Sequence, residues 1–288
     1  MGVVLGGFGA RKWFRRGVAL AGQGRLEEAR DAYLRAAEAG HVDAQYNLGL
    51  VHVDLGERAD AIRWFRRAAE AGDTGAMHSL ARQLLGGDHE EVVEALRWYA
   101  KASGDGHAPS QYNMGLHYQT AGELPTAERF FAMAAKQGHL DADVSLAGLW
   151  LGRGRRAEAE EILRRAAEKG HPGALGFLGD LAKERGDTER AARFYLDSYR
   201  AGFSGAAVNL GLMYEKQGSL GEAEDWLVQA AADGNAGGMY ALGRLLVGLD
   251  RRDEAVGYFR EAAELGDESA RRALQILAVP EEDARGQE

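Results

Sequence analysis

The chain has 288 residues, of which 45% are hydrophobic and 27% charged, and 44 acidic against 35 basic residues give a net charge of −9. This composition excludes an intrinsically disordered chain. The acidic balance predicts no nucleic-acid partner, because phosphate contacts supply most of that affinity. The chain has no cysteine, which excludes disulfides, thiolate metal sites and a cysteine nucleophile.

Residues 1–10 form a short N-terminal segment in which an apolar stretch precedes a basic cluster, Arg11, Lys12, Arg15 and Arg16. A secretory signal has the opposite order and a longer apolar run, so we expect a cytoplasmic protein. No apolar run reaches the roughly 18 residues that a membrane span requires. The basic cluster could contact a membrane or a nucleic acid, although such charges on a first helix are more often solvated. Frequent Ala, Gly and Arg suggest a bacterial source.

A repeat occupies residues 11–278. A closing glycine recurs every 32 residues, apart from one interval of 34: Gly40, Gly72, Gly106, Gly138, Gly170, Gly202, Gly234 and Gly266. A two-residue insertion accounts for the longer interval, and we expect it to lengthen the turn at 85–89. Such a period predicts stacked supersecondary units.

Each repeat predicts two helices. In the second repeat Ala44, Leu48 and Val51 are spaced i, i+4, i+7, the period of one helix face. Gly56 is placed to end that helix. A second apolar face, at 61, 65 and 68, runs up to the closing Gly72.

Three columns repeat in phase with these helices. The first is small in every repeat (Gly17, Gly49, Ala81, Gly115, Ala147, Gly179, Gly211, Gly243), and the second is always alanine (Ala29, Ala61, Ala95, Ala127, Ala159, Ala191, Ala223, Ala255). The third is large and apolar (Tyr33, Phe65, Tyr99, Phe131, Leu163, Tyr195, Leu227, Phe259). We expect the first two columns to let paired helices approach closely, and the third to fill the space between one repeat and the next.

After Gly266 a half-repeat follows, with Ala270 and Leu274 in phase but Gln275 in the small column. We interpret it as a capping helix, and the acidic tail 279–288 as disordered. The predicted fold is all-α: a right-handed α-α superhelical solenoid of eight helix–turn–helix repeats plus a C-terminal capping helix, about 17 helices in all.

These columns resemble the tetratricopeptide repeat. The first repeat carries the likeness most fully, with Trp13, Gly17, Leu20, Gly24, Ala29, Tyr33 and Ala36. The joints at 37–49 and 106–115 resemble those of the Sel-like branch, although the turn at 55–58 is shorter than usual there and the Pro common at the end of tetratricopeptide units is absent. The resemblance implies a right-handed superhelix whose concave face binds partners.

A partner-binding groove is predicted along the first helices of the repeats. Its candidate residues are Tyr46, Asn47, Leu50, His78, Arg82, Tyr112, Asn113, Leu116, Asn209, Tyr240 and Arg244. An Asn side chain both donates and accepts, which suits an extended peptide backbone. The alternative is that these Asn residues brace the neighbouring repeat. Tyr46 and Tyr112 stand where the carboxylate clamp of the family needs Lys, so a C-terminal carboxylate is not the expected ligand.

Neither a catalytic nor a metal site is predicted. His41, His107, His139 and His171 each follow a closing glycine, but successive repeats separate them by more than a shared metal allows, so we expect them to cap helices. No zinc-protease or serine-hydrolase motif occurs. We therefore predict a non-catalytic protein or peptide scaffold without cofactors. The alternatives are a peptide-sensing regulatory protein and a hydrolase on a Sel-like scaffold.

Overall fold

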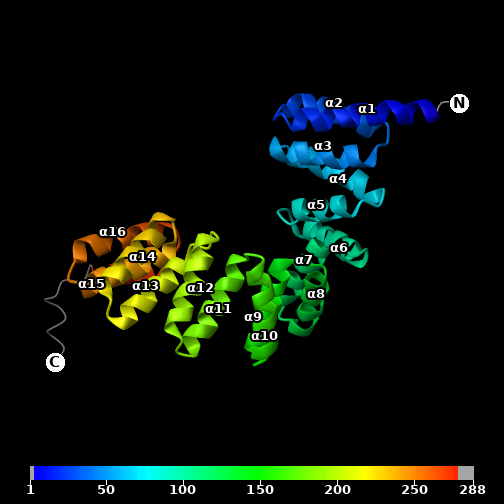
Figure 1. Ribbon diagram of the computed structural model, residues 1–288. Helices are drawn as coiled ribbons and strands as arrows, with labels where there is room; N and C mark the ends of the chain where they lie inside the picture. The colour runs from blue at the N-terminus through cyan, green and yellow to red at the C-terminus, as the bar shows by residue number, and fades with distance from the viewer. Residues whose placement is uncertain (1–2, 278–288) are drawn as a thin grey trace. The chain divides into compact units, whose positions relative to one another are not determined.

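The computed structural model describes the backbone of residues 3–277 and the side chains of residues 9–277 (Figure 1). This part of the chain contains 17 helices and no strand. The first eight are α1 (Val3–Ala21), α2 (Leu26–Glu38), α3 (Val42–Asp54), α4 (Arg58–Glu70), α5 (Thr74–Leu84), α6 (His89–Gly104), α7 (Ala108–Thr120) and α8 (Leu124–Lys136). The remaining nine are α9 (Leu140–Gly152), α10 (Arg156–Glu168), α11 (Pro172–Glu184), α12 (Thr188–Arg200), α13 (Gly205–Gln217), α14 (Leu220–Ala232), α15 (Ala236–Gly248), α16 (Arg252–Glu264) and α17 (Glu268–Leu277).

The chain forms two compact units, Met1–Leu149 and Trp150–Glu288. In the first unit, α1 to α8 pack as four consecutive helix pairs, and each pair packs on the next. In the second unit α11 to α16 form three such pairs, and α17 covers α16. The predicted all-α solenoid of helix–turn–helix repeats with a capping helix is confirmed over the described residues. No helix among them has the length and apolarity needed to cross a membrane.

The small and alanine columns hold each helix pair together. Every residue of the alanine column is completely buried. A Cβ atom added at Gly49 of α3 would lie 2.5 Å from the ring of Phe65 in α4, and one added at Gly115 of α7 would lie 2.5 Å from Phe131 in α8. The large column therefore packs on the small column of its own repeat. The same large residues share core clusters with the next repeat, as Phe65 does with Met77 and Leu80, so they also fill the space between repeats, as expected.

Each repeat ends and restarts through the same backbone geometry. Gly72 has φ 97°, in the left-handed region that favours glycine, and the next N–H, of Asp73, donates to the carbonyl of Ala68 at 3.1 Å. The Asp73 carboxylate then accepts from the N–H of Ala76 at 2.6 Å, which caps the start of α5. At Asp250 a non-glycine residue takes the left-handed conformation, with φ 61°.

Two local features differ from the sequence expectations. The insertion within 85–89 lengthens the turn, as expected, to residues 85–88 where the second repeat has only 55–57, but it also extends α6, which has 16 residues where the other second helices have 13. α1 begins at Val3, so most of segment 1–10 is continuous with the first helix. The predicted tail 279–288 lies outside the described residues.

Candidate partner-binding face

The aromatic groove candidates pack on the large column of their own repeat, and Tyr46 and Tyr112 also reach the next repeat, at Gly75 and His139. Tyr46 and Tyr240 are half-buried, with ring centroids 5.8 Å from Phe65 and Phe259 respectively. The ring of Tyr112 lies 5.7 Å from Phe131 and stacks at 4.7 Å on His139, the residue that begins the next repeat. These rings are thus packed against protein on at least one side.

At Gly176 and Phe203 the aromatic ring of the joint comes from the next repeat and not from the first helix. Gly176 occupies the position of Tyr46 and Tyr112 in the repeat, and Phe203 occupies that of His139. A Cβ atom built on Gly176 would lie 3.8 Å from the Phe203 ring. An aromatic side chain therefore fills this joint even where the first helix carries glycine, which identifies the column as a packing position.

His78 forms a polar version of the joint. Its Nδ1 lies 3.2 Å from Ser110 Oγ, which in turn lies 2.9 Å from Nδ1 of His107. The two imidazole centroids are 5.1 Å apart, and Ser110 is completely buried. Burial, reinforced by the neighbouring His107 and Arg82, lowers the pKa of His78 to about 4. His78 is thus neutral at physiological pH and serves the packing of α5 on α7.

The asparagine candidates differ in what they contact. The Asn47 amide donates to the carbonyl of Asp43, in its own helix, at 2.7 Å. Asn113 is half-buried in α7 at the equivalent position. Asn209 lines a cavity of about 480 Å³ in the second unit, beside the α11–α12 turn and α13. The other residues lining this cavity are Lys183, Gly186, Thr188, Leu212, Met213, Lys216 and Gln217.

The remaining candidates belong to one repeated position, directly after the small column, which we call the first-helix stripe. In the first unit it comprises Val18, Leu50, Arg82, Leu116 and Gly148; in the second it comprises Asp180, Leu212, Arg244 and Ile276. Three of its apolar members are exposed, Val18 by 48%, Leu212 by 38% and Ile276 by 72%, whereas Leu50 and Leu116 are half-buried. Arg244 pairs with Glu215 of the preceding repeat at 2.7 Å. The three exposed apolar members are not among the predicted groove residues, although the spacing that selects Leu50 and Leu116 also selects them.

Histidines at the repeat starts cap helices and do not converge on a metal. The Nδ1 atoms of His41, His139 and His171 accept from the backbone N–H three residues later, at 3.4, 3.3 and 3.2 Å. His107 contacts the hydroxyl of Ser110 instead, as described above. This arrangement agrees with the predicted capping role.

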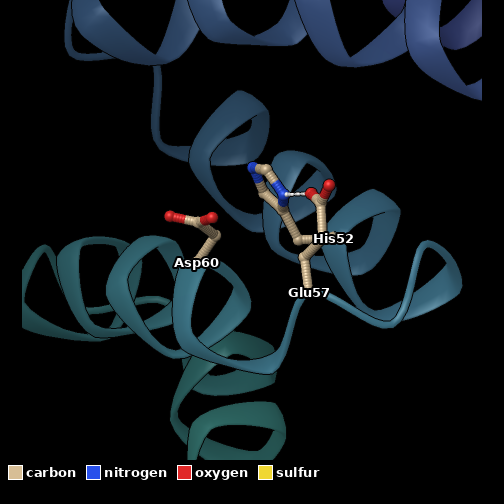
Figure 2. A group of neighbouring side chains, drawn as sticks. All are labelled: His52, Glu57 and Asp60. Carbon is tan, nitrogen blue, oxygen red and sulfur yellow. Dashed lines mark hydrogen bonds and ion pairs between the residues drawn. The ribbon is translucent and has the colours of Figure 1, made fainter.

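One group of possible metal ligands exists among the described residues: His52 at the end of α3, with Glu57 and Asp60 at the start of α4 (Figure 2). His52 Nδ1 and Glu57 Oε2 are only 2.5 Å apart. Glu57 also faces Arg30 at 3.6 Å, and Asp60 pairs with Arg63 at 2.7 Å. Two guanidinium groups beside these carboxylates oppose a further cation, so the group is best explained as a brace across the α3–α4 turn.

Residues 14–76 and 135–165 each match the tetratricopeptide repeat family. A Sel1 repeat protein from Oxalobacter formigenes shares 25% identity and a TM-score of 0.69, over 93% of this chain and 87% of that one. A protective antigen of uropathogenic Escherichia coli strains, which displays an SLR fold, shares 25% identity and a TM-score of 0.68, over 93% of this chain and 64% of that one. An F-box protein of Arabidopsis thaliana is 31% identical over 91 residues, which are 32% of this chain and only 26% of that protein.

Proposed function

The chain is a tetratricopeptide-type repeat protein that resembles the Sel-like branch, and from this we propose that it is a non-catalytic scaffold that holds a protein or peptide along its first helices. The proposed contact face is the first-helix stripe together with the neighbouring Asn47, Asn113 and Asn209. We also propose a bacterial source, which the likeness to two bacterial proteins supports, and a cytoplasmic location.

The exposure of apolar residues at a single repeated position is the observation that carries this proposal. Val18, Leu212 and Ile276 lie in different repeats, yet all three follow the small column and all three are exposed. An isolated exposed leucine needs no explanation, but recurrence at one register of a solenoid is a pattern that a partner of matching period can use. Arg82 and Arg244 alternate with these residues and add polar contacts.

The cavity beside Asn209 suits one anchoring side chain of such a partner. Its volume, about 480 Å³, lies within the range of small-ligand pockets. Leu212 and Met213 supply apolar surface, while Lys183 and Lys216 supply positive charge. Lys183 is held 3.4 Å from Asp180, whereas Lys216 makes no ion pair with any described residue. A partner segment with an acidic side chain next to an apolar one fits this lining.

The experiment compares two double variants against a partner recovered by crosslinking and mass spectrometry. Val18→Asp with Leu212→Asp places a charge on the stripe once in each unit. Met133→Asp with Val228→Asp is the matched control, because these residues are each 42% exposed and lie on second helices, again one in each unit. We expect the stripe variant to weaken affinity about tenfold or more, since it charges apolar anchors, and the control to bind normally.

Equal affinities for both variants, with both folded by circular dichroism, would move the partner to another surface. The non-catalytic part of the proposal has its own test. We expect no turnover of a panel of generic hydrolase substrates above that of a heat-denatured sample, and turnover that survives repurification would contradict it.

A further inference from the structure

The cavity beside Asn209 brings together two lysines, a residue type that is scarce in this chain. Only 6 of the 35 basic residues are lysine, yet Lys183 and Lys216 both line this cavity of about 480 Å³. No other repeat has lysine at either position, although its helices pair in the same way. Helix pairing therefore does not require these two lysines, and their convergence on one cavity indicates a role in binding.

Three neutral polar side chains complete the set of donors around the cavity. These are Thr188 and Asn209, which are half-buried, and Gln217, which is exposed. The amides of Asn209 and Gln217 form no hydrogen bond with any described residue, whereas Asn47, at the position equivalent to Asn209, donates to its own helix at 2.7 Å. Each amide has two N–H donors, so both side chains can donate to a ligand.

No described carboxylate lines the cavity, and the acidic residues beside its lining residues in the sequence are paired elsewhere. These pairs are Glu184 with Arg156, Glu215 with Arg244, and Asp187 with the backbone N–H of Arg190. Lys183 has one ion pair, with Asp180 at 3.4 Å, and the same Asp180 oxygen accepts from the Tyr195 hydroxyl at only 2.6 Å. The lining therefore presents positive charge and free donors to a ligand, without an anion of its own.

We propose that this cavity binds a phosphoryl group, carried by a phosphoserine or phosphothreonine side chain of the partner. At neutral pH a phosphoryl group has a charge of about −1.5 to −2 and three strong acceptor oxygens, so it can satisfy both ammonium groups and the neutral donors together. A carboxylate has less charge and fewer oxygens. The described carboxylates commonly pair with arginine, as Glu254 does through two bonds of 2.7 Å to Arg251. Lysine lacks that planar fork and acts on a phosphate as a point charge.

The surroundings of the cavity favour a phosphorylated peptide over a free phosphate ion. Leu212, in the cavity wall, belongs to the first-helix stripe and is 38% exposed, and buried Met213 adds apolar surface. A residue next to the phosphorylated side chain can contact this surface, which a free ion leaves bare. The inference rests on the proposed partner-binding function, and it makes binding at this cavity depend on phosphorylation of the partner.

The test titrates the full chain with four probes and follows the backbone amides of residues 183–188 and 209–217 by NMR. The probes are acetylated leucyl-phosphoserine amide, the same dipeptide with unmodified serine, the same dipeptide with glutamate, and inorganic phosphate. We expect the phosphoserine probe to bind about tenfold more tightly than the serine probe, because its hydrogen bonds are charge-assisted. It should also bind roughly fivefold more tightly than either the glutamate probe or inorganic phosphate.

Three results would overturn the proposal. Equal binding of the glutamate probe would assign the cavity to a carboxylate, equal binding of inorganic phosphate would assign it to the free ion, and a phosphoserine probe that shifts none of these amides would leave no phosphoryl site. None of them decides whether the first-helix stripe holds a partner, because the probes require no partner. That question belongs to Val18→Asp with Leu212→Asp.

The variant Lys183→Gln/Lys216→Gln should bind the phosphoserine probe about tenfold or more weakly, since it removes both cations from the cavity. Its matched control is Lys136→Gln/Lys169→Gln, which removes two exposed lysines that also form no ion pair with a described residue and shifts the net charge equally, from −9 to −11. We expect the control to bind the probe as the unaltered chain does. Equal losses in both variants would show that overall charge, and not the cavity, governs binding, which contradicts the proposal.

Discussion

Glycines at different places in one repeat have opposite effects on stability. Gly243 in α15 faces Phe259 so closely that an added Cβ would lie 2.7 Å from its ring. Gly257 lies in the middle of α16, and an added Cβ would meet nothing within 4 Å. The first glycine is required by packing, whereas the second only adds flexibility to the unfolded chain.

Gly243→Ala should therefore destabilise the second unit by roughly 1–3 kcal/mol, because a methyl group 2.7 Å from the Phe259 ring forces the ring or the helix to shift. Gly257→Ala should stabilise it by about 0.5–1 kcal/mol, because alanine favours the helix and restricts the unfolded chain. Urea-unfolding midpoints of the two variants check this pair. Shifts of the two urea midpoints in the same direction would show that close packing on Phe259 is not the reason why the small column has glycine at 243.

Half-buried His78 makes the stability of the first unit depend on pH. Its folded-state pKa, about 4, lies below the ordinary value of 6.5, so the unfolded chain takes up a proton more readily. The contribution of neutral His78 is fully present above pH 6.5 and is lost as pH falls toward 4. The free energy of unfolding falls between neutral pH and about pH 4.5, and we expect His78→Asn to reduce that fall by roughly 2 kcal/mol, after allowance for the partial exposure of His78. Denaturation midpoints at both pH values measure it, and identical losses in variant and parent would refute it.

At the scale of elements, an amide clamp joins three successive helices. The Gln111 amide in α7 donates to the carbonyl of Ser103 in α6 at 3.2 Å, and its oxygen accepts from Gln137, after α8, at 2.7 Å. Gln45 in α3 repeats the first half of this clamp by donating to Ala37 at 3.2 Å. The buried side-chain oxygen of Gln45 has no hydrogen-bond partner among the described residues, because Ala71 stands where the other repeat has Gln137.

Ala71→Gln should complete the clamp and stabilise the first unit by about 0.5–1.5 kcal/mol, since a buried acceptor gains its missing donor. The gain should vanish in a Gln45→Met background, because methionine, which occupies this position as Met77, accepts hydrogen bonds poorly. A double-mutant cycle, measured by thermal or urea unfolding, isolates the interaction energy between the side chains at positions 45 and 71. A gain that persists in the Gln45→Met background would assign it to helix propensity instead.

At the scale of the molecule, the chain divides into two compact units, and contacts pass from each helix pair to the next within α1 to α8 and within α11 to α16. In such an architecture the free energy of unfolding is a sum of the stabilities of single repeats and of the interfaces between neighbouring repeats. A destabilising substitution should therefore affect mainly its own repeat and the adjacent ones. Ala191 in α12 is completely buried, so it is a suitable site for such a substitution, because leucine there overpacks the helix pair.

Ala191→Leu should cost roughly 1–3 kcal/mol and raise amide hydrogen exchange in α11, α12 and α13. Exchange in α3 to α6, in the other unit, should stay as in the parent chain. Peptide-resolved exchange with mass spectrometry makes the comparison, and Ala59→Leu, at an exposed position of α4, serves as the control. Uniformly faster exchange along the whole chain would indicate one cooperative unit.

The sequence by itself determined the repeat, the helix pairs and the buried alanine column. Helix periodicity and the glycines at helix ends are local properties, contained within about 32 residues. They recur in eight repeats, so the pattern in each repeat supports its assignment in the others. The capping histidines followed for the same reason, because His41 and His139 bond to an N–H only three residues away.

Only the tertiary structure decided which side chains along the first helices pack against protein, which form hydrogen bonds and which stay exposed. Tyr46, Asn47 and Leu50 share a helix and a period, yet Tyr46 packs in a joint and Asn47 bonds to its own backbone. Pairing of charges was also invisible in the sequence, because Arg66 meets Glu94 across 28 residues while Arg11 meets no acidic partner among the described residues. Exposure and ion pairing depend on which neighbouring repeat comes close, and the spacing of residues within one helix does not contain that information.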